Sequence, residues 1–465
     1  MAVCVLTLIG GGCSLPSAQT GKISAQKPAP VASASKPEAQ KTKQAYLELG
    51  PLLGHIGPTE AKIWAKASGP SILALRVGQK EDLSDGRETA GVKTEEDTFF
   101  SSHLRVEKLA PAQRYYYCVL VDGKPAMSLP YPSFQTAPNT GEKGRVRFAF
   151  VSCVGYNGFD SAPTWAEMAT RTNFDLLLML GDNHYGDTTD PKKHLEKFTV
   201  QRKLAAYAEI SRKVPQYAIW DNHDYSPEPC DKTAKNKEDT LRAFKMLWPN
   251  PAYGEPENPG VYHKFSRGQV DFFMTDGRYY RDPNKAPDDG NKSMLGKKQL
   301  AWLEKELLAS KAPVKVIGSG GEFESNGILN SWSSFKSERE ELFKFIEDNK
   351  ITGVLLLSGD RHFTAAYQVL GKWIEVSSGP MGSKNSETKP TPEMFFYATK
   401  GKYFCIYDID TRADNPSVVL EIYRAGDGLI ERRHFSWDEV LGVAKIKPLS
   451  VTQGKSVGGE RKSSQ

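Results

Sequence analysis

Between residues 145 and 360, short apolar runs alternate with amphipathic stretches, and each apolar run stops at small or polar residues. Runs of this kind are typical of strands buried on both faces of a sheet, and the stretches between them have helical spacing. The alternation predicts an α/β domain with helices on the faces of its sheets. The runs begin at Val146, Phe174, Gln216, Val314 and Gly353, and the helical stretches cover 163–171, 191–212, 235–248, 296–309 and 335–349.

Two segments of this region have a different pattern. Tyr262–Tyr280 and Tyr403–Phe435 contain alternating runs joined by Arg-Gly or Gly-Asp-Gly turns, which predict antiparallel hairpins at the sheet edges. For residues 145–440 we therefore predict a mixed-sheet, layered α/β domain rather than a purely doubly wound one.

Residues 46–137 have an all-β pattern. Strand-length runs begin at Ala61, Ile72 and His103 and are separated by Gly, Pro and Asp-Gly turns. The stretch from Leu109 to Gly123 resembles a fibronectin type III strand pair, in which a Pro-containing turn leads into an aromatic-rich strand. We predict a fibronectin- or immunoglobulin-like sandwich whose tyrosines belong to its core and corners.

The N-terminal residues predict export. Residues 1–13 form a short apolar run closed by small residues and Cys13, which resembles a bacterial lipoprotein signal; a disordered apolar tip is the alternative. Residues 14–43 and 454–465 have the composition of a disordered tether and a disordered tail. We expect a periplasmic or cell-surface protein that meets the membrane only through a lipid on Cys13, because no apolar stretch is long enough to span a bilayer.

The composition excludes some classes of protein. The chain has 465 residues, of which 39% are hydrophobic, as in a folded protein of two or three domains. Its 61 basic and 56 acidic residues nearly cancel and are scattered, so no surface specific for nucleic acid is expected. The six cysteines lack the spacing of a zinc site or a disulfide framework, and any disulfide pairing stays open.

Carboxylate and imidazole side chains follow the predicted strands where those strands end. Ligands of α/β sheets bind outside the carboxyl ends of the strands. One Asp or His in such a place is usually a turn former or a helix cap, whereas four endings of this type in one domain predict a metal site. The endings are Ser152-Cys153, Gly181–Tyr185, Asp221–Asp224 and Gly359–His362.

The endings are similar to the motifs of calcineurin-like metallophosphoesterases, and in particular of their alkaline phosphatase D (PhoD-like) branch. That branch has Ser-Cys, Gly-Asp-x-x-Tyr, Trp-Asp-[Asp/Asn]-His-Asp-Tyr, Asp-x-Arg-x-Tyr-Arg and Gly-Asp-Arg-His in this order. The resemblance covers roughly residues 46–440, and the combined motifs are far more specific than any one of them. The matching motifs begin at Ser152, Gly181, Trp220, Asp276 and Gly359.

The resemblance implies a centre of Fe3+ and Ca2+, whose number and identity stay open. Thiolate, phenolate and imidazole suit Fe3+, and hard oxygens suit Ca2+. Asp182 would bridge the two metals. Without this context Cys153 would be an inert buried thiol and Tyr185 a packing residue. The implied ligands are Cys153, Tyr185 and His362 for the first metal, Asn222 and Asp360 for the second, and Asp182 for both.

His223 is the predicted general acid, and one of its neighbours, Asp221 or Asp224, would orient it. It would protonate the leaving alkoxide while a water activated by the metals attacks phosphorus in line. Arg278 and Arg281, on a predicted hairpin, would clamp the phosphate bidentately; a surface ion pair is the alternative.

The sequence departs from the family pattern in two places. The wider superfamily has a Gly-His before the last motif, but the matching strand here ends at Ser319-Gly-Gly-Glu322, so Glu322 as an oxygen ligand or a missing ligand are both open. His184 stands where the family more often has an apolar residue, and either a substrate contact or a tolerated substitution would explain it.

The predicted function is metal-dependent hydrolysis of phosphate esters at the cell envelope, of the alkaline phosphatase or phosphodiesterase type. The preference for monoesters or diesters and the natural substrate stay open, and a sugar- or lipid-phosphate diesterase is an alternative. A catalytically inactive surface binding or adhesion protein is an alternative from another class. Binding alone would not require the set Asp182, Asn222, His223, Asp360 and His362, which argues against that reading.

Overall fold

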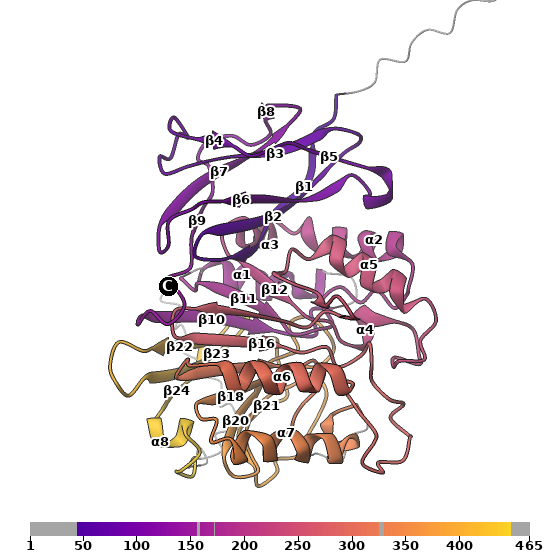
Figure 1. The fold of residues 1–465 in the computed structure, drawn as a ribbon, viewed down its shortest axis with the longest axis vertical. Helices are drawn as coiled ribbons and strands as arrows, with labels where there is room; N and C mark the ends of the chain where they lie inside the picture. The colour runs from indigo at the N-terminus through magenta and orange to yellow at the C-terminus, as the bar shows by residue number, and fades with distance from the viewer. Residues whose placement is uncertain (1–43, 156–158, 172, 325–329, 448–465) are drawn as a thin grey trace, which may run out of the picture. The chain divides into compact units, whose positions relative to one another are not determined.

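The computed structural model (Figure 1) describes residues 44–155, 159–171, 173–324 and 330–447. The predicted leader with Cys13, the tether and the tail at 454–465 lie outside these residues. Within the described part of the chain, no helix combines the length and the apolar character that a membrane span requires.

The N-terminal region consists of two antiparallel sheets with a common apolar core. Side chains that alternate along the strands fill this core, among them Ile63, Leu75, Tyr117 and Val119. The predicted all-β sandwich is therefore confirmed. One sheet contains β1 (Leu47–Ile56), β2 (Glu60–Ala67) and β6 (Ser101–Glu107); the other contains β3 (Ile72–Gly78), β4 (Arg87–Glu88), β5 (Val92–Lys93), β7 (Arg114–Val121), β8 (Lys124–Pro125) and β9 (Ser133–Gln135).

Two mixed sheets follow, as the mixed α/β prediction requires. The first has the order β12-β11-β10-β22-β23-β24 and the second the order β15-β16-β17-β18-β20-β19-β21. The first comprises β10 (Arg145–Val151), β11 (Leu176–Met179), β12 (Gln216–Ala218), β22 (Tyr403–Asp410), β23 (Ser417–Arg424) and β24 (Gly428–Phe435). The second comprises β15 (His263–Arg267), β16 (Val270–Met274), β17 (Val314–Gly318), β18 (Val354–Ser358), β19 (Thr364–Val369), β20 (Trp373–Ser377) and β21 (Met394–Ala398); β13 (Gly254–Glu255) pairs only with β14 (Asn258–Pro259).

The helices lie at all five predicted positions, with one difference. The stretch predicted as a single helix over 191–212 is two helices, because the chain is extended at Leu204 (φ −65°, ψ 123°). The longer helices are α1 (Ala162–Ala169), α2 (Pro191–Arg202), α3 (Ala205–Ser211), α5 (Lys237–Leu247), α6 (Lys297–Ala309) and α7 (Lys336–Asp348); α4 (Asn222–Tyr225) and α8 (Trp437–Val440) are single turns.

The two large sheets pack face to face. Along β17 and β18, Val316 and Leu355 enter the core shared with the first sheet, whereas Ile317 and Leu356 enter a second core under α6 and α7 (Figure 1). Strands buried on both faces are mostly apolar, and the two polar residues in these runs are both hydrogen-bonded. Lys315 donates from Nζ to the carbonyl oxygen of Ala312, and Ser358 donates from its hydroxyl to Glu375.

The predicted hairpins are present, with one correction. β15 and β16 pair through a turn at Gly268 (φ 57°), and β22, β23 and β24 form an antiparallel meander at one side of the first sheet. However, β16 ends at Met274, so Asp276 and the residues after it form a loop rather than part of the hairpin.

Candidate metal centre

The candidate residues follow the carboxyl ends of β10, β11, β12 and β18. Most of them have positive φ angles, in the left-handed backbone region. Residues other than glycine rarely adopt this conformation, which costs on the order of 1 kcal/mol or more for each residue. Strain of this kind persists only where the surrounding packing enforces it. The φ angles are 53° at Cys153, 54° at Asp182, 49° at Tyr185, 48° at Asp187, 69° at Asp360 and 56° at His362.

Glycines let these strand ends approach one another. A Cβ atom on Gly181 (φ 111°) would lie 2.6 Å from Cβ of Asp221, and one on Gly320 would lie 2.8 Å from Cγ of the same aspartate. A side chain at Gly320 would therefore collide with Asp221.

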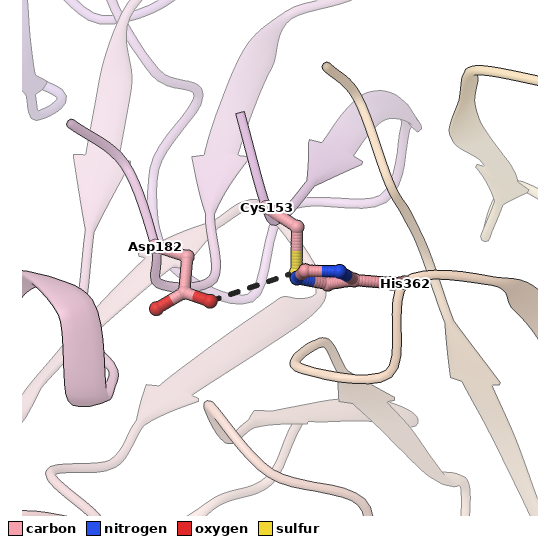
Figure 2. A group of neighbouring side chains, drawn as sticks. All are labelled: Cys153, Asp182 and His362. Atoms are coloured by element: carbon pink, nitrogen blue, oxygen red, sulfur yellow. Dashed lines mark hydrogen bonds between the residues drawn. The ribbon is translucent and has the colours of Figure 1, made fainter. Parts of the chain in front are cut away.

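The first group of candidate ligands contains Cys153, Asp182 and His362, whose ligand atoms all lie within 4.8 Å of one another (Figure 2). Cys153 Sγ lies 3.8 Å from Asp182 Oδ2. Tyr185 joins the group through its hydroxyl oxygen, 3.2 Å from Nε2 of His362. The structure thus brings together the thiol, phenol, imidazole and carboxylate expected around the first metal.

The second group contains Asp182, Asp221 and Asp360, again with ligand atoms within 4.8 Å of one another. Asp182 belongs to both groups, which is the position that a bridging carboxylate needs. Asp221 Oδ2 and Asn222 Oδ1 are buried without a hydrogen-bond partner among the described residues. Buried oxygens without partners are costly, and a cation would satisfy them, so this oxygen-rich set fits a hard metal ion.

The crowding of these acids favours a bound cation. Burial, followed by the charge of Asp221, raises the pKa of Asp182 well above its usual range and that of Asp360 to about 6. Burial and Asp182 likewise raise the pKa of the Cys153 thiol. Like charges at this separation destabilise one another, whereas metal ions would stabilise the deprotonated forms.

His223 has a partner that the sequence did not indicate. Its Nδ1 atom lies 2.6 Å from Oδ1 of Asp187, and its ring stacks on Tyr185 with centroids 4.4 Å apart. Although burial opposes the charged form, the hydrogen bond with Asp187 and the charge of Asp182 raise the pKa of His223 to about 9. The prediction that Asp221 or Asp224 orients His223 is corrected: that position belongs to Asp187.

Asp224 instead holds the loop that carries Tyr185. Its carboxylate accepts hydrogen bonds from the backbone N–H groups of Asn183 (2.9 Å) and His184 (3.1 Å). The imidazole of His184 is buried, with Nε2 2.9 Å from Nδ1 of His194. His184 is therefore a packing residue beneath this loop, and the substrate-contact alternative for it is not supported.

Arg278 and Arg281 lie in the loop after β16, and both are buried, with 2% of their surface exposed, so the alternative of a surface ion pair is wrong. Arg278 donates from Nε to Asp221 Oδ1 at 2.6 Å, and its Nη2 atom is buried without a partner among the described residues. Arg281 donates to Asn284 Oδ1, and its guanidinium lies 4.5 Å from the centre of the Phe335 ring. Burial and the charge of Arg278 lower the pKa of Arg281 to about 9.

Glu322 lies outside both groups of candidate ligands. Its Oε2 atom accepts from Arg361 at 3.1 Å and its Oε1 atom from Tyr367 at 2.7 Å. Burial raises the pKa of Glu322 to about 7. The carboxylate thus neutralises the arginine of the Gly-Asp-Arg-His motif rather than adding an oxygen to the metal-binding groups.

Comparison with known proteins gives two family matches. The PhoD-like phosphatase model matches residues 148–403, and a domain of unknown function (DUF7800) matches residues 44–139. Alkaline phosphatase D of Bacillus subtilis is 26% identical over 338 residues, which cover 61% of this chain and 57% of that protein. Purple acid phosphatase 23 of Arabidopsis thaliana is 23% identical over 306 residues, 60% of each chain.

A solved structure of PhoD has the same fold, with a TM-score of 0.68 and 18% identity over 86% of this chain and 94% of that one. The chain spans less than two thirds of the length of both curated relatives. The family model, in contrast, covers more than half of the chain and includes every candidate metal ligand. The chain therefore belongs to the PhoD-like phosphatase family.

Proposed function

We propose that the protein hydrolyses phosphate esters, as an alkaline phosphatase or phosphodiesterase, at a centre of two metal ions. The observation that supports this most is the position of Asp182, whose carboxylate belongs to two adjacent groups of candidate ligands. An inactive binding protein has no need for two such groups, so the adhesion alternative is not favoured.

The donor sets of the two groups differ. Cys153, Tyr185 and His362 would hold the first metal, for which we propose Fe3+, since thiolate and phenolate are poor ligands for Ca2+. Asp221, Asn222 and Asp360 would complete an oxygen-rich second site, for which we propose Ca2+. When bound, such ions lower the pKa of a water molecule and neutralise charge on the phosphoryl oxygens.

The remaining residues position and protonate the substrate. The free Nη2 group of Arg278, next to Asp221, would donate to a phosphoryl oxygen, while Asn330 and Asp221 fix the rest of the guanidinium. His223 would donate its Nε2 proton to the leaving oxygen, because Nδ1 is held by Asp187.

Replacing His223 with Asn is expected to lower kcat about 100-fold or more while leaving the metal content unchanged. The loss should be large for phenyl phosphate and small for 2,4-dinitrophenyl phosphate, whose leaving group needs no proton. Asp187→Asn should show the same dependence with a smaller loss, because it acts through His223. The exposed His434→Asn serves as the control, and equal losses on both substrates would contradict the general-acid role.

Replacing Arg278 with Lys is expected to raise KM for para-nitrophenyl phosphate about tenfold, because lysine keeps the charge next to Asp221 but loses the planar fork. Metal content should stay at the wild-type level. The matched control is Arg412→Lys, an exposed arginine paired with Asp410. An unchanged KM in Arg278→Lys would rule out the phosphate contact.

We also propose export with lipidation of Cys13, which the sequence alone supports. Mass spectrometry of the mature protein should find a lipid-modified cysteine at its N-terminus. An intact Met1 on the mature protein would overturn this proposal.

A further inference from the structure

A polar cavity with a volume of about 440 Å³ lies on the first sheet beside the end of α1. Arg147 precedes Cys153 by six positions, so at about 3.3 Å per extended residue the cavity lies on the order of 20 Å from the candidate metal ligands. It is therefore separate from the metal centre. We call it the arginine pocket, and it is lined by Arg147, Thr170, Arg171, Asn173, Tyr423 and Arg432.

The arginine pocket is lined by hydrogen-bond donors and by no carboxylate. The buried Glu421 next to it is fully engaged: Oε2 accepts from Arg147 and from Tyr423, and Oε1 accepts from Arg432. Asp408 lies 3.8 Å from Arg147 but is the partner of Arg145. One shared carboxylate holds two guanidiniums in place without neutralising both, so the pocket keeps a positive charge.

Several donors in the pocket remain available. Arg432 uses Nε and Nη2 on Glu421, which leaves its Nη1 group. Arg171 is fixed through Nη2 by Glu167 at 3.0 Å and by the Tyr423 ring at 5.1 Å, which leaves its Nη1 group. The carbonyl oxygen of the Asn173 side chain accepts from Arg147, so its amide NH2 group is left for another acceptor.

We propose that the arginine pocket binds a tetrahedral oxyanion, phosphate or sulfate, either free or carried on a small organic molecule. Guanidiniums held in place by a carboxylate present their remaining N–H groups as a fixed fork, which matches the oxygens of such an anion. The volume is that of a small-molecule site and exceeds the needs of a bare oxyanion, so an attached sugar-sized group also fits.

Isothermal titration calorimetry with inorganic sulfate and with glucose 6-sulfate tests this proposal, because neither probe is a phosphate ester. The full-length protein should bind glucose 6-sulfate with one-to-one stoichiometry. The double variant R171Q/R432Q should bind it about tenfold more weakly or worse, since it loses two charged donors. Both arginines are partly exposed, so the variant should fold normally, and it should hydrolyse para-nitrophenyl phosphate at the wild-type rate.

The control is Arg412→Gln, which removes an exposed arginine from outside the pocket and should leave binding unchanged. Equal affinity for both probes would assign the site to the free oxyanion, and tighter binding of the sugar ester would assign it to an organic carrier. No binding of either probe at millimolar concentration, or undiminished binding to R171Q/R432Q, would overturn the proposal. Neither result depends on whether the protein is a phosphatase.

Discussion

Replacing Asp182 with Asn is expected to remove both metal ions and to lower phosphate-ester hydrolysis at least 1000-fold. The carboxylate lies in both groups of candidate ligands, so its loss takes an anionic ligand from each. An amide cannot bridge two cations with two charged oxygens, and the remaining acids would then take up protons. We expect this to be the largest effect of a single substitution in the chain.

The measurement is elemental analysis of the purified variant beside the wild type and the exposed Asp414→Asn as a control. Two further variants separate the sites. His362→Ala should lose only the first metal, and Asp360→Asn should lose only the second, since each side chain belongs to one group. If Asp182→Asn keeps both metals, or if His362→Ala and Asp360→Asn lose the same metal, the bridged arrangement is wrong.

Acid is expected to destabilise the protein through three histidines: His55 and His103 in one N-terminal sheet, which are half-buried, and His263 in β15, which is buried. Burial lowers the pKa values of His55, His103 and His263 to about 4. His103 Nε2 lies 3.1 Å from Met246 O, His55 lies near Glu60, and His263 Nε2 has no partner among the described residues. The three rings therefore stay neutral in the folded protein.

The direction of the pH effect follows from these values. The unfolded chain protonates its histidines near pH 6.5, whereas the folded chain does so only near pH 4, so the unfolded state binds more protons between these limits. The contribution of these histidines to stability is complete above pH 6.5 and is lost as the pH decreases towards 4. For each histidine, this decreases the free energy of unfolding by up to about 3 kcal/mol.

Urea denaturation at pH 7.5 and at pH 4.5 measures this loss in the wild type and in the double variant H103Q/H263Q. The buried acids and any loss of metal at low pH affect both proteins alike, so the difference between the two proteins measures the effect of the histidines on the free energy of unfolding. The variant should lose several kcal/mol less on acidification than the wild type. Equal losses in both proteins would show that these histidines are not the acid-sensitive groups.

Much of the architecture could be predicted because it depends on local patterns. Short apolar runs such as Val354–Ser358, alternating with helical stretches, predict strands buried on both faces, and the polar residues after them mark one edge of the sheets. The split between α2 and α3 was missed because nothing in the sequence around Leu204 breaks the helical spacing. The extended backbone there is set by tertiary packing.

Most ligand residues could be predicted because they follow the ends of strands, but the contacts between them could not. Asp221 was predicted only as a possible partner of His223, and the structure places it in the second group of candidate ligands. Asp187 follows Gly186 and has the sequence context of a turn former, so nothing local marks it as the partner of His223. The pairing of Arg278 with Asp221 joins positions 57 residues apart. Contacts of that range depend on how closely the strand ends approach, which the glycines at 181 and 320 determine.

We propose above all that this chain is a metal-dependent phosphoesterase with two adjacent metal sites. Elemental analysis of the purified protein, combined with assays on para-nitrophenyl phosphate and bis-para-nitrophenyl phosphate, tests it most directly. We predict two metal ions per chain, iron and calcium, and turnover of at least one of the two substrates that a chelator abolishes. Absence of bound metal and of turnover on both substrates, with iron and calcium supplied, would contradict the claim.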